Sequence, residues 1–302
     1  MRLACIGIGS NAIRLLIASW SEGRLIAQRR ERMGTRLFAG LVNGALTQQS
    51  IRSSVEAIAE LAEMARSDGA QEIFVFATSA VRDASNGREF TALAERACGA
   101  PVEIISGEQE AALSYAGASE GGACGVVDIG GGSTEFTLGL DEQILGAVSL
   151  QLGAVRMNAQ TPLCSVADYE GAVTRSLRVI RRDAKRLLAL PARDYWVGVG
   201  GTLTTLGAMK RGVPVFDPDT CEGMSMSLGE VASWGRLLAG ASMEERRRVV
   251  GLMPHRADII PCGIAILEAA MRAFNVEQLR LSAHGNMDGY LKRRFARDEA
   301  AV

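Results

Sequence analysis

The chain has 302 residues, 48% of them hydrophobic, and its 33 basic and 34 acidic side chains give a formal net charge of -1. This length favours two cores of ordinary domain size, and the balanced charge indicates neither a nucleic-acid nor a membrane partner, so an anionic substrate requires a local basic pocket. Six scattered cysteines without C-x-x-C spacing indicate reduced thiols. No run of about 20 apolar residues predicts a membrane span. We therefore expect a cytoplasmic protein.

The N-terminal part predicts a strand, a tight turn, a second strand, a hairpin turn and a third strand. Apolar residues 3–8 precede the turn Gly9-Ser10-Asn11, and two further strand-like runs follow, separated by Ser21-Glu22-Gly23. The same order recurs about 120 residues later, where residues 125–129 precede the turn Gly130-Gly131-Gly132-Ser133-Thr134. Two such units predict a duplicated fold in which each half contributes one glycine-rich turn to a shared cleft.

Between and around the two copies the chain alternates helix and strand, as α/β proteins do. Apolar spacing predicts, in chain order, a helix over 47–67, a strand over 72–77, a helix over 86–98, a strand over 101–105 and a helix over 108–118. The stretch Glu120-Gly121-Gly122 then marks a boundary. We predict an N-terminal domain over residues 1–119 and a C-terminal domain over residues 120–302.

Three glycine turns predict phosphate binding. A glycine turn after a strand can present successive backbone amides to phosphate oxygens, and the hydroxyls of Ser and Thr add donors. Besides the two repeated turns, Gly198, Gly200, Gly201 and Thr202 follow an apolar run and precede a helical stretch. A purely structural role stays open for each turn taken alone, whereas three turns with hydroxyl neighbours favour phosphate.

Residues 7–12 formally match the G-x-G-x-x-A dinucleotide fingerprint, which requires a helix directly after the turn. The residues that follow are rich in strand formers, so we predict a hairpin there and not a dehydrogenase. No G-x-x-x-x-G-K-[ST] sequence supports a P-loop enzyme.

Several charged side chains are candidates for the chemistry. Asp128 ends a strand beside the second turn and Glu135 follows that turn, which favours a magnesium site, although a turn cap and an exposed strand residue are the alternative. Glu108 and Glu110 begin a helix on different faces, so at most one is expected to point into the cleft. Arg82 follows a Thr-Ser turn and suits phosphate, unless it is a solvated arginine paired with the neighbouring aspartate.

Taken together, these residues resemble the exopolyphosphatase and guanosine pentaphosphate phosphohydrolase family of the actin-like ATPase superfamily. The combination of ATSAVR, ISGEQEA and DIGGGSTE is specific to that family, and the resemblance covers nearly the whole chain in its short two-domain form. It implies duplicated actin-like, or ribonuclease H-like, α/β domains with mixed sheets flanked by helices and an active site in the interdomain cleft. The implied activity releases orthophosphate from the terminal phosphoanhydride of inorganic polyphosphate or guanosine pentaphosphate, with Mg²⁺ as cofactor and a homodimer as a candidate assembly.

The resemblance also implies a role for each matching residue. Glu110 takes the position of the catalytic glutamate, the general base for the attacking water, and Arg82 that of the arginine that grips phosphate. Asp128 and Glu135 look like the carboxylates that hold magnesium and position the water. The implied phosphate cradle consists of Ser10, Asn11, Gly130, Gly131, Gly132, Ser133, Thr134, Gly200, Gly201 and Thr202.

Three positions depart from the family pattern. Gly7 stands where an aspartate is usual, Ala112 where an arginine is usual, and Met287 interrupts the late G-x-R-E-G pattern. Gly7 also corresponds to Asp128 in the internal repeat, so we expect weak magnesium binding that Gly7→Asp would strengthen. The departures leave open a sensor that binds polyphosphate or a nucleotide without turnover, and an actin-like kinase or ATPase is a further alternative.

Overall fold

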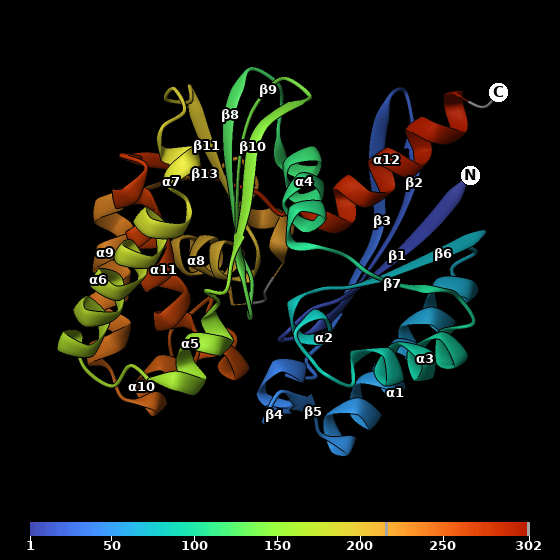
Figure 1. Ribbon diagram of the computed structural model, residues 1–302, viewed down its shortest axis with the longest axis horizontal. Coiled ribbons are helices and arrows are strands. Elements are labelled where there is room, and N and C mark those ends of the chain that lie inside the picture. Colours follow the sequence, from blue (N-terminus) through green and yellow to red (C-terminus); the bar gives the residue numbers. More distant parts are fainter. Residues whose placement is uncertain (215–216, 301–302) are drawn as a thin grey trace. The chain divides into compact units, whose positions relative to one another are not determined.

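The computed structural model describes residues 1–214 and 217–300. The chain forms two compact units. Unit 1 consists of Met1–Gly117 together with the segment that begins at Asn286, and unit 2 of Ala118–Gly285. Each unit contains one mixed β-sheet with helices beside it, coloured blue to teal with a red terminal helix in unit 1 and green to orange in unit 2 (Figure 1).

Unit 1 is built on a five-stranded sheet with the order β3-β2-β1-β6-β7. The β1–β2 and β2–β3 pairs are antiparallel hairpins, whereas β6 runs parallel to β1 and β7 parallel to β6. The elements are β1 (Arg2–Ile8), β2 (Ile13–Ser21), β3 (Arg24–Met33), η1 (Leu37–Gly40), β4 (Leu41–Val42), β5 (Ala45–Leu46), α1 (Gln48–Ser67), β6 (Glu72–Ala77), α2 (Ser79–Arg82), α3 (Gly87–Cys98), β7 (Val102–Ile104), α4 (Gly107–Ala118) and α12 (Asn286–Ala300).

Unit 2 is built on a six-stranded sheet with the order β10-β9-β8-β11-β13-β12. It repeats the two antiparallel hairpins of unit 1 in β8, β9 and β10, and β11 lies parallel to β8. The elements are β8 (Ala123–Ile129), β9 (Thr134–Leu140), β10 (Gln143–Leu150), α5 (Ala154–Gln160), α6 (Val166–Asp183), α7 (Lys185–Leu188), β11 (Tyr195–Val199), α8 (Gly201–Arg211), η2 (Pro218–Cys221), β12 (Ser225–Ser227), α9 (Leu228–Gly240), α10 (Met243–Arg247), η3 (Pro254–Arg256), α11 (Ile260–Ala273) and β13 (Gln278–Leu281).

The predicted repeat is confirmed in atomic detail. The turn after β1 is closed by a hydrogen bond from the Gly9 backbone N–H to the Ala12 carbonyl, 3.1 Å, and the turn after β8 by the same bond from Gly130 to Ser133, 3.0 Å. Antiparallel pairing resumes directly on both sides of each turn. A hairpin therefore follows the first turn, and the dinucleotide fingerprint is excluded because no helix begins there.

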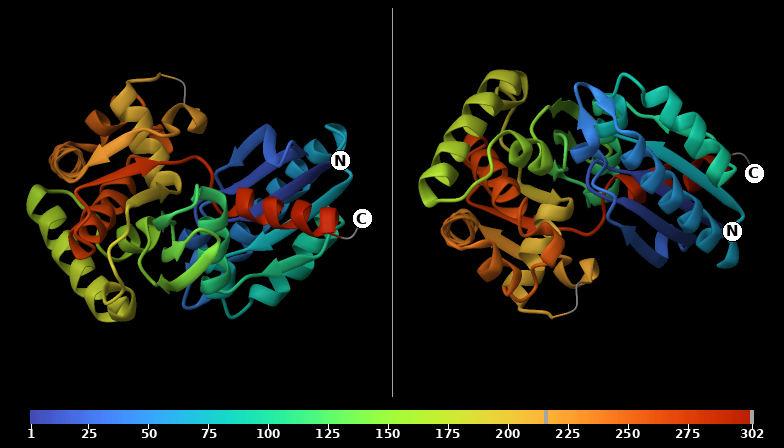
Figure 2. Two further views of the ribbon diagram at one scale, coloured as in Figure 1. Left: turned by 90° about the horizontal axis from the view of Figure 1, so that it is seen from above. Right: turned by 90° about the horizontal axis from the view of Figure 1, so that it is seen from below.

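Helix α11 forms the centre of the unit 2 core. Apart from Glu268, its residues from Ile260 to Met271 are apolar or small, and all of them are buried. A helix of this composition has to be covered on several sides. It contacts α6, α9 and β8, and Figure 2 shows α11 in red-orange beside the yellow-green α6.

The C-terminal helix α12 belongs to unit 1, which differs from the predicted assignment of residues 120–302 to a single second domain. Its apolar face carries Met287, Tyr290 and Phe295, which are buried in one cluster with side chains of β1, β2 and β6. Phe295 stacks on Trp20 with ring centroids 5.7 Å apart, and Tyr290 stacks on Phe76 at 5.3 Å. The chain thus returns to its first sheet because α12 covers an apolar face there.

Among the described residues, no helix is long and apolar enough to cross a membrane. The six cysteines are free thiols, five of them buried and Cys164 exposed. Burial raises the pKa of Cys262 to about 12 and also raises that of Cys5, so these thiols stay protonated and act as small core side chains.

Candidate active site

The glycine turn between β8 and β9 is held from one side by α5. The carbonyl oxygen of Gly130 accepts the backbone N–H of Ala154 at 3.0 Å, and that of Gly131 accepts the N–H of Val155 at 2.8 Å. Arg156 Nε donates to the Gly132 carbonyl at 2.7 Å. Since the C=O and N–H of one trans peptide point in opposite directions, the amides that follow these carbonyls point away from α5. This geometry suits a row of amides that binds a phosphate.

Two buried carboxylates lie side by side next to this turn. Asp128 and Glu135 are directly opposite each other in the antiparallel β8–β9 pair, so their side chains share one face of the sheet. They are only 7% and 2% exposed. Glu135 accepts a hydrogen bond from the Ser149 hydroxyl at 2.6 Å, and Ser149 is its partner on β10. Like charges in such a pair destabilise a sheet unless a cation or donors offset them.

The carboxylate pair fits Mg²⁺. Magnesium takes oxygen ligands and is usually held by one or two carboxylates, with water and substrate phosphate completing the octahedron. A site of three or more acidic, histidine or cysteine side chains is not found in the part of the chain that the structure describes. Asp128 and Glu135 would therefore be the protein ligands of an ion that also binds the substrate.

The third glycine turn approaches the same carboxylate. Gly200 has a φ of 93°, which side chains other than glycine rarely adopt, and an added Cβ would lie 2.7 Å from Asp128 Oδ1. The next residue, Gly201, begins α8 and packs against the guanidinium of Arg256, which is only 6% exposed. The backbone N–H groups of the first helical turn, together with this guanidinium, can bind an anion.

Two hydroxyls predicted for the phosphate cradle lie in different surroundings. Thr134 Oγ1 donates to the Leu152 carbonyl at 2.5 Å, so it fixes the segment before α5. The Thr202 hydroxyl lies against Gly263, where α8 packs on α11. Both side chains are almost completely buried, at 0% and 1% exposure. Any phosphate contact of Thr134 would therefore come from its backbone N–H, whereas the Thr202 hydroxyl has no hydrogen-bond partner among the described residues.

The first glycine turn, in unit 1, is also held from one side by hydrogen bonds to its carbonyl groups. The carbonyls of Ser10 and Asn11 accept backbone N–H groups of Phe38 and Arg36 at 2.8 and 3.0 Å, which leaves the following amides pointing away from η1. Ser10 is 4% exposed. The Asn11 side-chain nitrogen is buried and has no hydrogen-bond partner within the described ranges. Because a buried donor without an acceptor is costly, this amide is suited to a ligand oxygen.

Glu110 and Arg82 form an ion pair in unit 1. Arg82, at the end of α2, donates to Glu110 Oε2 at 3.2 Å and to the Ile105 carbonyl at 2.9 Å. Their side chains are 20% and 9% exposed. Glu108, two residues before Glu110 on α4, is exposed, as the helical spacing predicts for the opposite face. The solvated-arginine alternative for Arg82 is therefore wrong, and Glu110 is the glutamate that lies beside a cation.

Sequence reasoning missed four residues that shape these turns: Ser149, Gly153, Arg156 and Arg256. The sequence contains only weak indications of their roles. Gly153 and Arg156 belong to the segment LQLGAVRM, whose residues become meaningful only once α5 is seen to dock on the turn. Ser149 reads as an ordinary strand residue until its register with Glu135 is known.

We expect Gly153→Ala to weaken substrate binding. An added Cβ would overlap the Gly131 carbonyl, so the glycine turn would have to move by several tenths of an ångström. The Michaelis constant for the phosphate substrate should rise about tenfold while cooperative thermal unfolding is retained. Gly229→Ala on α9 is the matched control, because its nearest neighbour beyond the helix, Ser227 Oγ, is 4.0 Å away. An equal increase of the Michaelis constant in both variants would contradict a role of the glycine turn in substrate binding.

Comparisons with known proteins place this geometry in context. Residues 16–297 match the model of the Ppx/GppA phosphatase family. Exopolyphosphatase 2 of Mycobacterium tuberculosis is 31% identical over 312 residues, which cover 95% of this chain and 97% of that protein. A crystal structure of the Aquifex aeolicus Ppx/GppA family member superimposes with a TM-score of 0.82 at 29% identity, covering 99% of this chain and 98% of that one. An exopolyphosphatase from Cytophaga hutchinsonii, 21% identical over 98% of both chains, shares the fold with a TM-score of 0.88. The predicted mixed α/β fold of the actin-like type is confirmed.

Proposed function

Because the chain belongs to the Ppx/GppA phosphatase family, we propose that it is an exophosphatase that hydrolyses the terminal phosphoanhydride of inorganic polyphosphate and releases orthophosphate. The observation that carries the proposal is the buried Asp128–Glu135 pair beside an amide-lined glycine turn. Two opposed carboxylates next to a phosphate cradle are suited to a metal-assisted reaction on an anionic substrate. Each of the two repeated glycine turns joins two antiparallel strands, whereas the phosphate-binding turn of a dehydrogenase or a P-loop enzyme leads into a helix. These two turns therefore do not support either enzyme class.

In the proposed reaction, water attacks the terminal phosphorus and the bond from that phosphorus to the bridging oxygen breaks. Glu110 takes the proton of the water, and the shortened chain leaves as an anion. Arg82 holds the Glu110 carboxylate at 3.2 Å and offers its remaining N–H groups to the transferred phosphate. The backbone amides after Gly130 and at the start of α8 bind phosphate oxygens. Bound Mg²⁺, held by Asp128 and Glu135, would neutralise charge on the phosphates.

Guanosine pentaphosphate is the alternative substrate, since its 5′-terminal phosphoanhydride undergoes the same reaction. Orthophosphate release should be measured in parallel from long polyphosphate, tripolyphosphate, guanosine pentaphosphate and ATP, with and without Mg²⁺. We expect magnesium-dependent release that is fastest with polyphosphate. Binding without release from any of these substrates would establish the sensor alternative, and ATP turnover far above polyphosphate turnover would favour the kinase or ATPase alternative.

We also propose a cytoplasmic location, with a homodimer as the candidate assembly. The free cysteines fit a reducing compartment, where thiols persist. Light scattering of the purified chain tests the assembly: a molar mass of one chain at micromolar concentration would contradict the dimer.

We expect Arg82→Lys to weaken substrate binding despite the retained charge. Both printed bonds of Arg82 come from Nη1, so the other nitrogens of its planar fork can reach a phosphate, whereas lysine has a single nitrogen for all three partners and loses this second prong. The Michaelis constant for polyphosphate should rise about tenfold. Arg88→Lys on α3 is the control, because Arg88 is exposed. A Michaelis constant equal to that of the unmodified protein would remove Arg82 from substrate binding.

A further inference from the structure

The second half of α6 and the short helix α7 carry a cluster of basic side chains, which we name the basic stripe. Its members, all of them exposed, are Arg175, Arg178, Arg181, Arg182, Lys185 and Arg186. Residues 175–186 contain a single acidic residue, Asp183, so six positive charges and one negative charge give this segment a net charge of +5. The formal net charge of the whole chain is -1, and its balance therefore conceals a local excess of positive charge.

The α6 part of the basic stripe points away from the core of unit 2. Helix α6 packs on α11 and α9 through a face whose buried residues are Tyr169, Ala172, Val173, Ser176 and Ile180. Arg175, Arg178 and Arg182 follow one another at i, i+3 and i+7, which places them on one face, and their exposure shows that it is the opposite face. Figure 2 shows the yellow-green α6 at the periphery of unit 2, so a large ligand can reach the stripe.

Ion pairs within the protein do not neutralise the basic stripe. Arg182 pairs with Asp183 at 2.6 Å, which engages the single acidic residue of the segment. Within the described ranges, neither an ion pair nor a side-chain hydrogen bond is formed by Arg178, Arg181, Lys185 and Arg186. Four of the six positive charges are therefore available to a ligand.

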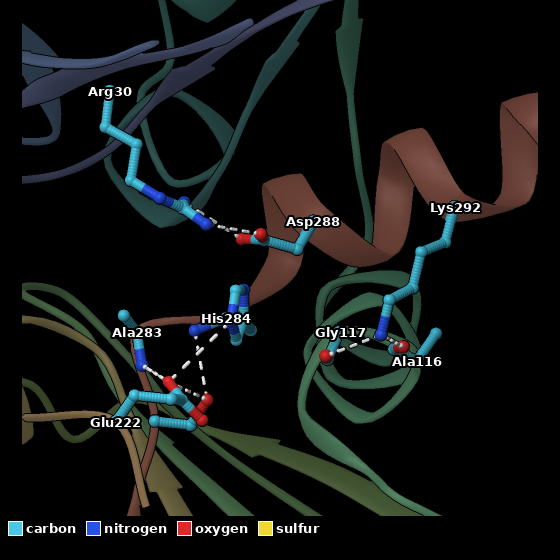
Figure 3. Close-up of polar contacts among 9 residues, drawn as sticks. Arg30, Ala116, Gly117, Glu222, Ala283, His284, Asp288 and Lys292 are labelled. Carbon is cyan, nitrogen blue, oxygen red and sulfur yellow. Dashed lines mark hydrogen bonds and ion pairs between the residues drawn. The ribbon is translucent and has the colours of Figure 1, made fainter. Parts of the chain in front are cut away.

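Several basic side chains elsewhere in the chain have partners. In unit 1, Arg30 pairs with Asp288 at 2.7 Å, and Lys292 donates to the carbonyls of Ala116 and Gly117 at 3.2 and 2.9 Å (Figure 3). The exposed faces of α1 and α3 also mix acidic with basic residues, as solvated helices commonly do. The basic stripe lacks this mixture.

The stability of α6 does not account for the basic stripe. Like charges at i, i+3 and i, i+4 spacing repel, and Arg178 has this spacing to both Arg181 and Arg182. Attraction to the negative end of the helix dipole acts only within the last turn. It therefore favours Arg181 and Arg182 but not Arg175 and Arg178. A row of charges that the helix does not need is a candidate for ligand binding.

The basic stripe lies at a distance from the glycine turn of unit 2. Helix α7 packs on β10 at Gly146, where an added Cβ would lie 3.2 Å from Leu190 and 3.5 Å from Leu187. Gly146 precedes Leu150, the partner of Thr134 at the turn, by four residues, or about 13 Å along the strand. Only a long anionic ligand can contact both places at once.

We propose that the basic stripe binds the distal part of a long condensed phosphate chain whose terminal part lies at the glycine turn. A row of cations matches the repeated negative charges of such a chain, and guanidinium and ammonium groups form charge-assisted hydrogen bonds with phosphate oxygens. The inference rests on the proposed function for the identity of the ligand. It adds a preference for long over short polyphosphate, which the glycine turn cannot provide by itself.

The first experiment measures binding by calorimetry without Mg²⁺, with long-chain polyphosphate and with tripolyphosphate. The stripe variant combines Arg178→Gln, Arg181→Gln and Lys185→Gln, and its dissociation constant for long-chain polyphosphate should rise about tenfold. The salt dependence of this affinity should flatten, because phosphate contacts are lost. Its dissociation constant for tripolyphosphate should stay within about twofold of that of the unmodified chain, since tripolyphosphate is too short to reach the stripe.

The control variant removes the same number of positive charges from exposed positions of unit 1, by Arg52→Gln, Arg88→Gln and Arg96→Gln. It should bind long-chain polyphosphate as the unmodified chain does. Equal weakening in the two variants would mean general charge attraction and would overturn the proposal, as would unchanged affinity of the stripe variant. Polyuridylate tests the other class of polyanion: binding as tight as that of long-chain polyphosphate, and lost in the stripe variant, would identify a nucleic-acid surface and also overturn the proposal.

Steady-state kinetics separate the basic stripe from the proposed function. In the stripe variant the Michaelis constant for long-chain polyphosphate should rise about tenfold at an unchanged turnover number, with both constants for tripolyphosphate unchanged. If the unmodified chain releases no phosphate but the stripe variant still binds long-chain polyphosphate more weakly, the stripe stands and the exophosphatase assignment fails. If release is normal and the stripe variant has the same affinity and Michaelis constant as the unmodified chain, the stripe fails alone.

Discussion

Glu110→Gln is expected to lower the rate of orthophosphate release about 100-fold or more, with little change in the Michaelis constant. Glutamine keeps the size of the side chain and an oxygen that can accept from Arg82 at the present 3.2 Å. It cannot take a proton from water at neutral pH, so only the chemical step is affected. Steady-state kinetics of phosphate release from polyphosphate give the turnover number and the Michaelis constant separately.

Glu108→Gln is the matched control for this variant. Glu108 lies in the same first turn of α4, but it is exposed, whereas Glu110 is 7% exposed. The control should leave the turnover number within about twofold of the unmodified chain, because surface substitutions away from partners have small effects. Unchanged turnover in Glu110→Gln would remove this residue from the mechanism, and equal losses in both variants would indicate a general disturbance of α4.

The second large effect is expected for Asp128→Asn. Asparagine keeps the shape but removes one charge from the Asp128–Glu135 pair, so magnesium should bind more weakly and release of phosphate at a fixed magnesium concentration should fall about 100-fold or more. Part of the loss should return as magnesium is raised. The measurement is a magnesium titration of phosphate release for both proteins.

Thermal unfolding without magnesium provides an independent readout of the same variant. Removing one of two opposed buried carboxylates relieves repulsion, so the melting temperature of Asp128→Asn should stay equal or rise. Asp183→Asn is the control, because Asp183 lies on α6 of the same unit and pairs with the exposed Arg182. A lower melting temperature together with an unchanged magnesium requirement would show that Asp128 is a structural turn residue.

Much of the fold follows from local patterns in the sequence. Short apolar runs and glycine turns predict both hairpin units, and the structure confirms their strands, turns and the helices between them. The face of a helix is also a local property, which is why at most one of Glu108 and Glu110 was expected to point into the cleft before any contact was known. The family resemblance then assigned the catalytic position to Glu110. Likewise, the position of Asp128 and Glu135 on either side of one tight turn already indicated that they share a face.

Other features depend on contacts between distant segments, and these only the tertiary structure decided. The docking of α12 on the first sheet and the hydrogen bonds from α5 to the glycine turn join segments that are far apart in the chain. The sequence by itself determined which segments become strands, turns and helices, since those preferences arise from each residue and its near neighbours. The hydroxyl that faces a carbonyl and the unit that receives the last helix are decided by the packing of surfaces that meet only after folding. Local preferences carry no information about those partners.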